Sequence, residues 1–159
     1  MKRVTILLLL AFVFMYMSAQ GEKELVHFVI LDHRYNDEDL TDFSLDKENY
    51  ISISVDDENN ISMFNITSEG QSYGKISRVQ HERIEKTEDG NKLDWYSFRW
   101  SYSNTYDTEK GSCFVQLIIS YRDQANIFDL KMIDESLNSS VYRGYIEGMP
   151  KLNEYINIE

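Results

Sequence analysis

The stretch from Tyr50 to Thr67 reads YISISVDDENNISMFNIT, and it decides the fold of this chain. In its first six residues, isoleucine and valine alternate with serine, which is the period-two pattern of a strand with one buried face. Residues 57–60 (DENN) favour a turn, because Asn and Asp tolerate a left-handed backbone. Apolar residues return after this turn. The stretch therefore predicts a β-hairpin with strands at 50–55 and 61–67.

Alternating runs bounded by turn-forming residues continue on both sides of this hairpin. Asp89-Gly90 is the strongest hairpin signal in the chain, because this dipeptide suits a two-residue turn. Further strands are predicted at residues 25–31, 73–86 with a break near Gln80, 93–102, 113–121, 127–133 and 141–146. The less regular segments are predicted as a loop or short helix at 36–49, a helical turn at 134–140, and a strand or short helix at 152–158.

About eight strands joined mostly by short turns favour antiparallel neighbours. The predicted fold class is therefore all-β, an antiparallel meander that closes as a barrel or folds as a two-layer sandwich. We favour the barrel, whose architecture resembles that of lipocalins by an analogy that rests on strand number alone. Residues 20–159 are predicted to form a single β-rich domain.

Residues 1–19 have the layout of a secretory signal peptide. Met1-Lys2-Arg3 is followed by an apolar run of fourteen residues, Val4 to Met17, and by Ser18-Ala19. That run is shorter than the roughly 20 residues that a membrane-spanning helix needs. We expect cleavage after Ala19, with an uncleaved N-terminal anchor as the alternative. No later segment is apolar enough to cross a membrane, so the sequence predicts a secreted or periplasmic protein.

The composition limits the partners that the protein can have. The chain has 27 acidic and 16 basic residues, with a formal net charge of −11. Such a surface repels phosphate backbones and anionic lipid, so we expect no nucleic-acid partner. Cys113 is the single cysteine, which leaves no internal disulfide. Secreted eukaryotic domains of this size usually carry disulfides, so the composition favours a bacterial envelope or secreted protein.

The strand at 93–102 carries the most distinctive pattern, because its alternate residues Tyr96, Phe98 and Trp100 are all aromatic. One interpretation places them in an ordinary core. The functional interpretation is that they line a pocket, since aromatic walls with polar tips suit apolar or sugar-like ligands. Tyr73 and Tyr121 are weaker candidates for the same lining.

Trp95 and Arg99 lie on the opposite face of that strand. If the aromatic face is core, these two side chains point outward. Trp and Arg are typical anchors of protein interfaces. The sequence therefore offers Trp95 and Arg99 as candidate interface residues.

Residue patterns that carry catalysis are missing. The chain has no Gly-x-Ser-x-Gly motif and no glycine-rich phosphate loop. Its histidines, His27, His33 and His81, lack a short metal-ligand spacing, and each is interpreted as an ordinary core or surface residue. Cys113 opens an apolar strand, where a cysteine behaves as a small hydrophobe. We predict no catalytic residue, no metal site and no cofactor, and we favour a protein that is not an enzyme.

These observations predict an exported, non-catalytic binding module. Its ligand would be a small apolar or amphipathic molecule held on an aromatic-lined sheet face or in a barrel interior. The alternative is an interaction module or inhibitor whose partner is another envelope or extracellular protein. A hydrolase that uses a pair of carboxylates is the third candidate.

Overall fold

The computed structural model describes residues 22–46, 49–67, 70–105, 107 and 109–155. The predicted signal peptide, residues 1–19, lies outside the described residues. The described elements are β1 (Lys23–Tyr35), β2 (Glu38–Asp39), α2 (Thr41–Asp46), β3 (Tyr50–Val55), β4 (Ile61–Thr67), β5 (Gly70–Lys86), β6 (Lys92–Asn104), β7 (Lys110–Tyr121), β8 (Ile127–Asp134), β9 (Ser139–Glu147) and the 3₁₀ helix η1 (Leu152–Glu154). Among the described residues, no helix is both long enough and apolar enough to span a membrane.

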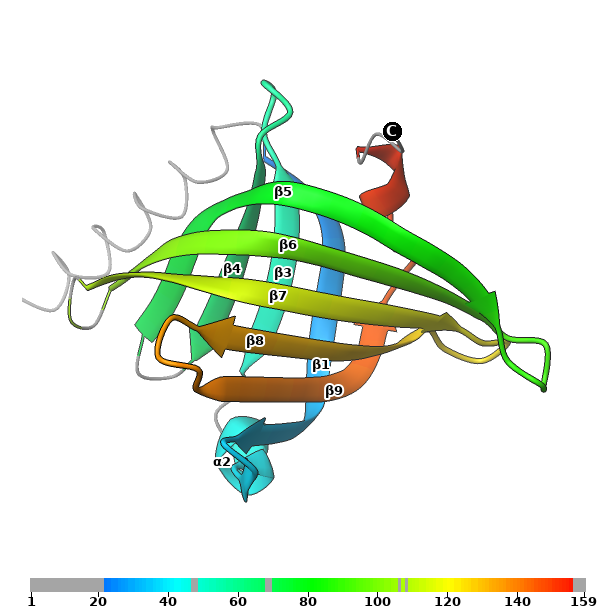
Figure 1. Ribbon diagram of the computed structural model, residues 1–159, viewed down its shortest axis with the longest axis horizontal. Coiled ribbons are helices and arrows are strands. Elements are labelled where there is room, and N and C mark those ends of the chain that lie inside the picture. The colour runs from blue at the N-terminus through cyan, green and yellow to red at the C-terminus, as the bar shows by residue number, and fades with distance from the viewer. Residues whose placement is uncertain (1–21, 47–48, 68–69, 106, 108, 156–159) are drawn as a thin grey trace, which may run out of the picture.

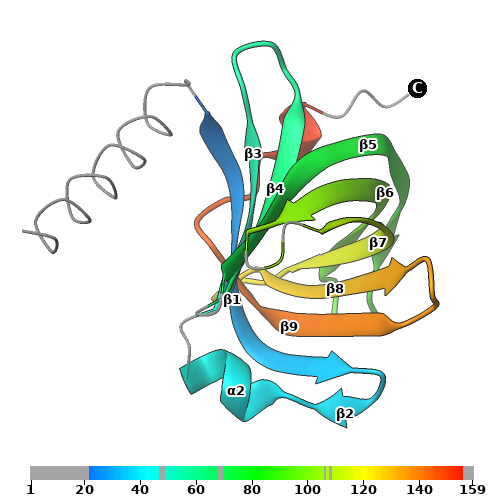
Figure 2. The same ribbon diagram turned by 90° about the vertical axis from the view of Figure 1, so that its left-hand side faces the viewer.

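The described strands form one antiparallel sheet in the order β2-β1-β3-β4-β5-β6-β7-β8-β9. β1 also pairs with β9, from His27 opposite Glu147 to Tyr35 opposite Ser140. This pairing closes eight strands into a barrel, and β2 is an additional strand beside the end of β1. Figure 2 shows the ring of strands viewed from one end. The prediction of an all-β antiparallel fold is confirmed, and the fold is the barrel rather than the sandwich.

The predicted hairpin has the predicted bounds, because β3 and β4 cover residues 50–55 and 61–67. Ile53 lies opposite Met63, and both side chains are fully buried. In the turn, the Asp56 carboxylate accepts the Asn60 backbone N–H at 2.8 Å, and Asn59 has a φ of 63°. The apolar alternation and the local turn chemistry therefore agree on one register.

Other predicted segments differ in detail. The break expected near Gln80 is present as bulges in β5, where Arg78 has a φ of 54°. The segment predicted as a loop or short helix at 36–49 contains β2 and α2. The predicted helical turn at 134–140 is a turn between β8 and β9, because Asp134 accepts the N–H groups of Ser136 and Asn138, both at 2.8 Å.

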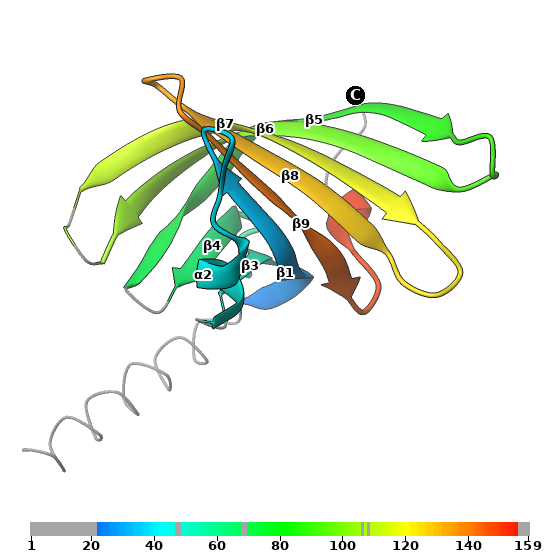
Figure 3. The same ribbon diagram turned by 90° about the horizontal axis from the view of Figure 1, so that it is seen from below.

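The two ends of the barrel differ. The mouth is the end with the β4–β5, β6–β7 and β8–β9 connections, and α2 lies beside it. The capped end carries the β3–β4, β5–β6 and β7–β8 turns together with η1. Figures 1 and 3 show α2 and η1 at opposite ends of the strands. At the capped end, Leu152 of η1 joins the core, and the Lys151 N–H donates to the Leu25 carbonyl at 3.0 Å.

The middle of the barrel is filled by side chains. Its inward-facing residues have no exposed surface, so no water-sized space adjoins them. They include Phe28, Ile51, Ile53, Met63, Val115, Leu117, Ile119 and Leu130. Any ligand site in the interior therefore has to lie toward an end of the barrel.

Candidate functional site

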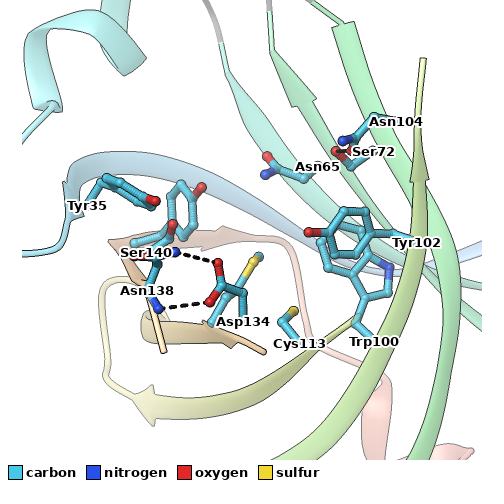
Figure 4. A pocket seen from close by; sticks show the side chains of 12 residues that line it. Tyr35, Asn65, Ser72, Trp100, Tyr102, Asn104, Cys113, Asp134, Asn138 and Ser140 are labelled. Carbon is cyan, nitrogen blue, oxygen red and sulfur yellow. Dashed lines mark hydrogen bonds between the residues drawn. The ribbon is translucent and has the colours of Figure 1, made fainter. Parts of the chain in front are cut away.

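A pocket of about 320 Å³ opens at the mouth of the barrel (Figure 4). Its walls come from β1, β4 to β9 and the β8–β9 turn, so strands far apart in the sequence meet around it. Its volume is at the lower end of the range for small-molecule sites. The lining residues are Tyr35, Asn65, Ser72, Trp100, Tyr102, Asn104, Cys113, Met132, Asp134, Asn138, Ser140 and Tyr142.

Trp100 closes the pocket toward the core and is 2% exposed. Its indole N–H is shared between the carbonyls of Met63 and Gly74, at 3.2 Å each. These bonds connect β6 with β4 and β5. The Tyr102 ring lies against the indole, with the ring centroids 4.5 Å apart. Trp100 thus has both roles that the sequence left open, since it is a core residue and a pocket wall.

Asp134 is the one carboxylate among the described residues that line the pocket. Its oxygens accept a hydrogen bond from the Asn138 side-chain amide at 2.9 Å and hydrogen bonds from the backbone N–H groups of Ser136 and Asn138. The hydrogen bonds from Asn138 hold the pKa of Asp134 below its usual value. Asp134 is therefore ionised at neutral pH, and its oxygens are already engaged by the turn.

Side-chain hydrogen bonds between neighbouring elements hold the rim of the pocket in place. On one side, Asn36 donates to the Asn138 side chain at 3.0 Å and accepts the Ser139 N–H at 2.8 Å. On the other side, the Ser72 hydroxyl donates to Asn104 at 2.6 Å. The first two bonds join the turn after β1 to the β8–β9 connection, and the third joins the mouth ends of β5 and β6. The rim is therefore preorganised, which lowers the ordering cost of binding.

Three polar side chains in the pocket remain available to form hydrogen bonds with a ligand. Within the described part of the chain, the side chains of Tyr35, Asn65 and Ser140 have no hydrogen-bond partner. They come from three separate strands, β1, β4 and β9. Figure 4 shows all three around the same opening. The pocket therefore combines aromatic walls with unused donors and acceptors.

His33 packs against Tyr142, which is one of the lining residues of the pocket. Its ring stacks on Tyr142, with centroids 4.2 Å apart and the planes 11° from parallel. Its Nδ1 lies 2.8 Å from the Ser44 hydroxyl of α2. Burial lowers the pKa of His33, so its ring is neutral at neutral pH. No local pattern marks His33 for this role, because its stacking partner Tyr142 is distant in the chain.

The structure does not bring the five predicted lining residues together. Trp100 lines the mouth pocket, whereas Tyr96 and Phe98 lie deeper in the core. Tyr73 packs against Phe64 on the outer face of the barrel, with the ring centroids 4.5 Å apart and the planes tilted by 36°. Tyr121 lies toward the capped end.

Cys113 also lines the mouth pocket, at its apolar base. Burial raises the pKa of its thiol to about 12, so the thiol stays protonated at neutral pH. A protonated thiol is a poor nucleophile and a poor metal ligand. Among the described residues, no group of three or more His, Cys, Asp or Glu side chains is arranged to hold a metal ion.

A second polar cluster lies inside the capped end, around Asp94. This carboxylate is fully buried and accepts a hydrogen bond from the Lys92 ammonium at 2.9 Å. The Tyr96 hydroxyl and the Asn153 amide of η1 lie 3.4 Å from the same oxygen, and Tyr96 also donates to Asn153. The His81 Nε2 lies 3.5 Å from the other oxygen. No sequence pattern marks this cluster, because its members lie on β5, β6 and η1.

Burial by itself would raise the pKa of Asp94. Hydrogen bonds from Lys92, Tyr121 and Asn153, together with the Lys92 charge, outweigh it, so the net pKa lies below the usual value of 3.8. Burial and the negative charge of Asp94 raise the pKa of Tyr96 and of Tyr121. The cluster therefore holds one ionised carboxylate and two neutral phenols at neutral pH.

We expect Asp94→Asn to lower the free energy of unfolding at neutral pH by about 2 kcal/mol, because hydrogen bonds to a charged acceptor are lost. The native pKa of Asp94 is depressed, so its contribution is complete above the unfolded-state pKa and is lost as the pH falls through the native value. The difference between wild type and variant should therefore shrink below about pH 3.8. Urea unfolding at several pH values measures this. A pH-independent difference would contradict it.

The outer face of β6 carries the predicted interface residues. Trp95 is partly buried, and its ring lies under the Arg83 guanidinium, 4.1 Å from ring centroid to Cζ. A groove of about 330 Å³ runs beside it, with Leu93, Ile118 and Ile127 in its lining. Arg99 points outward and donates to Ser112 at 2.9 Å, away from the residues of that groove.

Comparisons with family models, with characterised proteins and with solved structures found no match to this chain.

Proposed function

We propose that this protein is an exported, non-catalytic binding module that holds one small amphipathic ligand in the mouth of its barrel. The observation that carries the proposal is the mouth pocket. There, aromatic walls meet the unpartnered polar groups of Tyr35, Asn65 and Ser140. A ligand would gain roughly 25 cal/mol per Å² of apolar surface that it buries against the rings. The polar groups would fix its orientation.

Catalysis has less support at this site. Glycoside hydrolysis by the usual mechanism needs two carboxyl groups facing one bond. Asp134 is the single carboxylate among the described lining residues, and its oxygens already accept three hydrogen bonds. The function proposed for the pocket is therefore binding without reaction.

The proposal predicts that the protein, purified from its own compartment, carries an additional mass in a native mass spectrum and loses it on denaturation. Ser140→Phe should abolish this mass, because the new ring would fill the pocket. Ser136→Phe is the matched control, since Ser136 lies on the turn just before β9 and is exposed. Circular dichroism would verify that both variants fold. A bare wild-type protein, or a mass that Ser140→Phe retains, would contradict the proposal.

The outer groove beside Trp95 favours a second candidate function, a protein-interaction module. The indole nitrogen of Trp95 is buried and has no hydrogen-bond partner among the described residues. Tryptophan and arginine side chains are frequent hot spots of interfaces. A dimer or a co-purified protein in the native spectrum, lost on Trp95→Ala, would support this function instead.

A further inference from the structure

The size of the mouth pocket limits its ligand to about one ring. A water molecule takes up about 30 Å³ of liquid, so about 320 Å³ corresponds to roughly ten water-sized groups. Below the pocket, Val115 and Leu117 are 0% exposed and fill the barrel. A long acyl chain therefore has no path along the barrel axis. A compact molecule with the dimensions of a single ring fits the space.

The charge of the pocket favours an uncharged ligand. No Lys or Arg is among the described residues that line it, and Asp134 contributes a negative charge. The whole chain has a net charge of −11. A phosphate or carboxylate would enter this field without a compensating cation, which is unfavourable. The oxygens of Asp134 already accept hydrogen bonds from its own turn, so the site does not offer a free carboxylate to a cation either.

The unpartnered polar groups suit a ligand with several hydroxyls. The Asn65 carboxamide offers two donors and an acceptor in one plane, which match neighbouring hydroxyls on a ring. The Tyr35 and Ser140 hydroxyls can each donate and accept. A ligand with only one polar group would leave most of these groups without a partner, and buried polar groups without partners are costly. The polar side of the pocket therefore selects for many hydroxyls.

The apolar side of the pocket is formed by the rings of Trp100 and Tyr102, whose planes are tilted by 30°. The Tyr102 ring lies beside Trp100 and directly over Gly111. A Cβ at Gly111 would come within 2.5 Å of the Tyr102 ring, so glycine is required for the ring to lie in this position. Aromatic faces favour the C–H face of a saturated ring as a packing partner. Gly111 therefore serves to shape this wall of the pocket.

We infer that the mouth pocket binds a neutral sugar ring, either as a free monosaccharide or as the terminal unit of a glycan. This inference rests on the proposed function, because it names the ligand class of the same pocket. A sugar ring combines an apolar C–H face with several hydroxyls at its edge and carries no charge. Those three properties match the Trp100–Tyr102 wall, the unpartnered side chains of Tyr35, Asn65 and Ser140, and the lack of Lys and Arg among the described lining residues.

The test is NMR titration of the purified protein, following the side-chain amide signal of Asn65 and the indole signal of Trp100. The probes are glucose, galactose and N-acetylglucosamine, a disaccharide of each, glucose 6-phosphate, cyclohexanol and decanoate. We expect a neutral sugar to shift both signals and glucose 6-phosphate to bind at least tenfold more weakly. Cyclohexanol and decanoate should leave both signals unchanged. Tighter binding of a disaccharide would identify a glycan end rather than a free sugar.

Asn65→Ala should weaken sugar binding about tenfold, because a desolvated hydrogen-bonding group is lost. Asn126→Ala is the matched control at the capped end, and its affinity should equal that of wild type. If cyclohexanol or decanoate binds in the pocket and no neutral sugar does, the sugar inference is overturned and the proposed function stands. If no probe shifts these signals and the native spectrum shows no bound mass, both fail. Equal sugar affinity in Asn65→Ala would also overturn the inference.

Discussion

Replacing Trp100 with alanine is expected to lower the free energy of unfolding by about 3–5 kcal/mol, the usual range for truncating a buried aromatic residue. The indole is 2% exposed, and its N–H connects β6 to the carbonyls of Met63 and Gly74. Alanine would leave a cavity and would remove this link between three strands. Chemical denaturation followed by circular dichroism measures the loss. At this chain length it corresponds to a decrease of about 10 °C in Tm.

Trp95→Ala is the matched control for Trp100→Ala. Trp95 is on the same strand but faces outward, and its ring is partly covered by Arg83. We expect a loss of about 1 kcal/mol, the central value for single substitutions. Similar losses in the two variants would contradict the assignment of Trp100 as a core residue. Trp100→Ala should also reduce affinity for the mouth ligand, because Trp100 forms a wall of the pocket.

Gly74→Ala is expected to destabilise the barrel by about 3 kcal/mol or more, at the upper end of the range for overpacked sites. A Cβ at this position would lie 1.8 Å from the Ser101 carbonyl oxygen and 2.5 Å from the Tyr102 Cα. Both atoms belong to the backbone of β6, so a change of rotamer cannot relieve the clash. β5 would have to move away from β6 at the point where the Gly74 carbonyl accepts the Trp100 indole.

Gly90→Ala provides the comparison for this effect. Gly90 has a φ of +82°, and a Cβ there would meet no atom within 4 Å. Its cost is backbone strain alone, about 1 kcal/mol. Equilibrium unfolding of both variants tests the difference. If alanine at position 74 costs no more than alanine at position 90, the close approach of β5 to β6 is not a constraint on this fold.

Local sequence patterns are sufficient to predict where most of the strands lie in the chain. The β3–β4 hairpin was predicted with its bounds, because apolar alternation and the turn residues at 57–60 give the same answer. The inward face of β6 could be predicted in the same way. Strand ends were less accurate: β1 continues to Tyr35, beyond the predicted 25–31, because its polar end pairs with β9. Pairing between distant strands has no local signal.

The candidate site was harder to predict than the strands. Trp100 was identified because it belongs to a distinctive aromatic pattern within one strand. Asn65 and Ser140 were not, because isolated Asn and Ser residues are common and neither has a local pattern that marks a site. They become lining residues only when β4 and β9 meet around the mouth. The same holds for Asp94 and Asn153, which meet across 59 positions of sequence.

The sequence by itself determined the class of this protein, since period-two alternation and turn residues specify antiparallel strands, and composition makes the chain acidic and free of internal disulfides. Only the tertiary structure decided that β1 pairs with β9 to close a barrel, that the middle is filled, and that a pocket remains at the mouth. The physical reason is the distance along the chain over which each kind of interaction acts. Backbone preference and alternation act between residues near in sequence, whereas barrel closure and pocket shape depend on packing between strands that are distant in the chain.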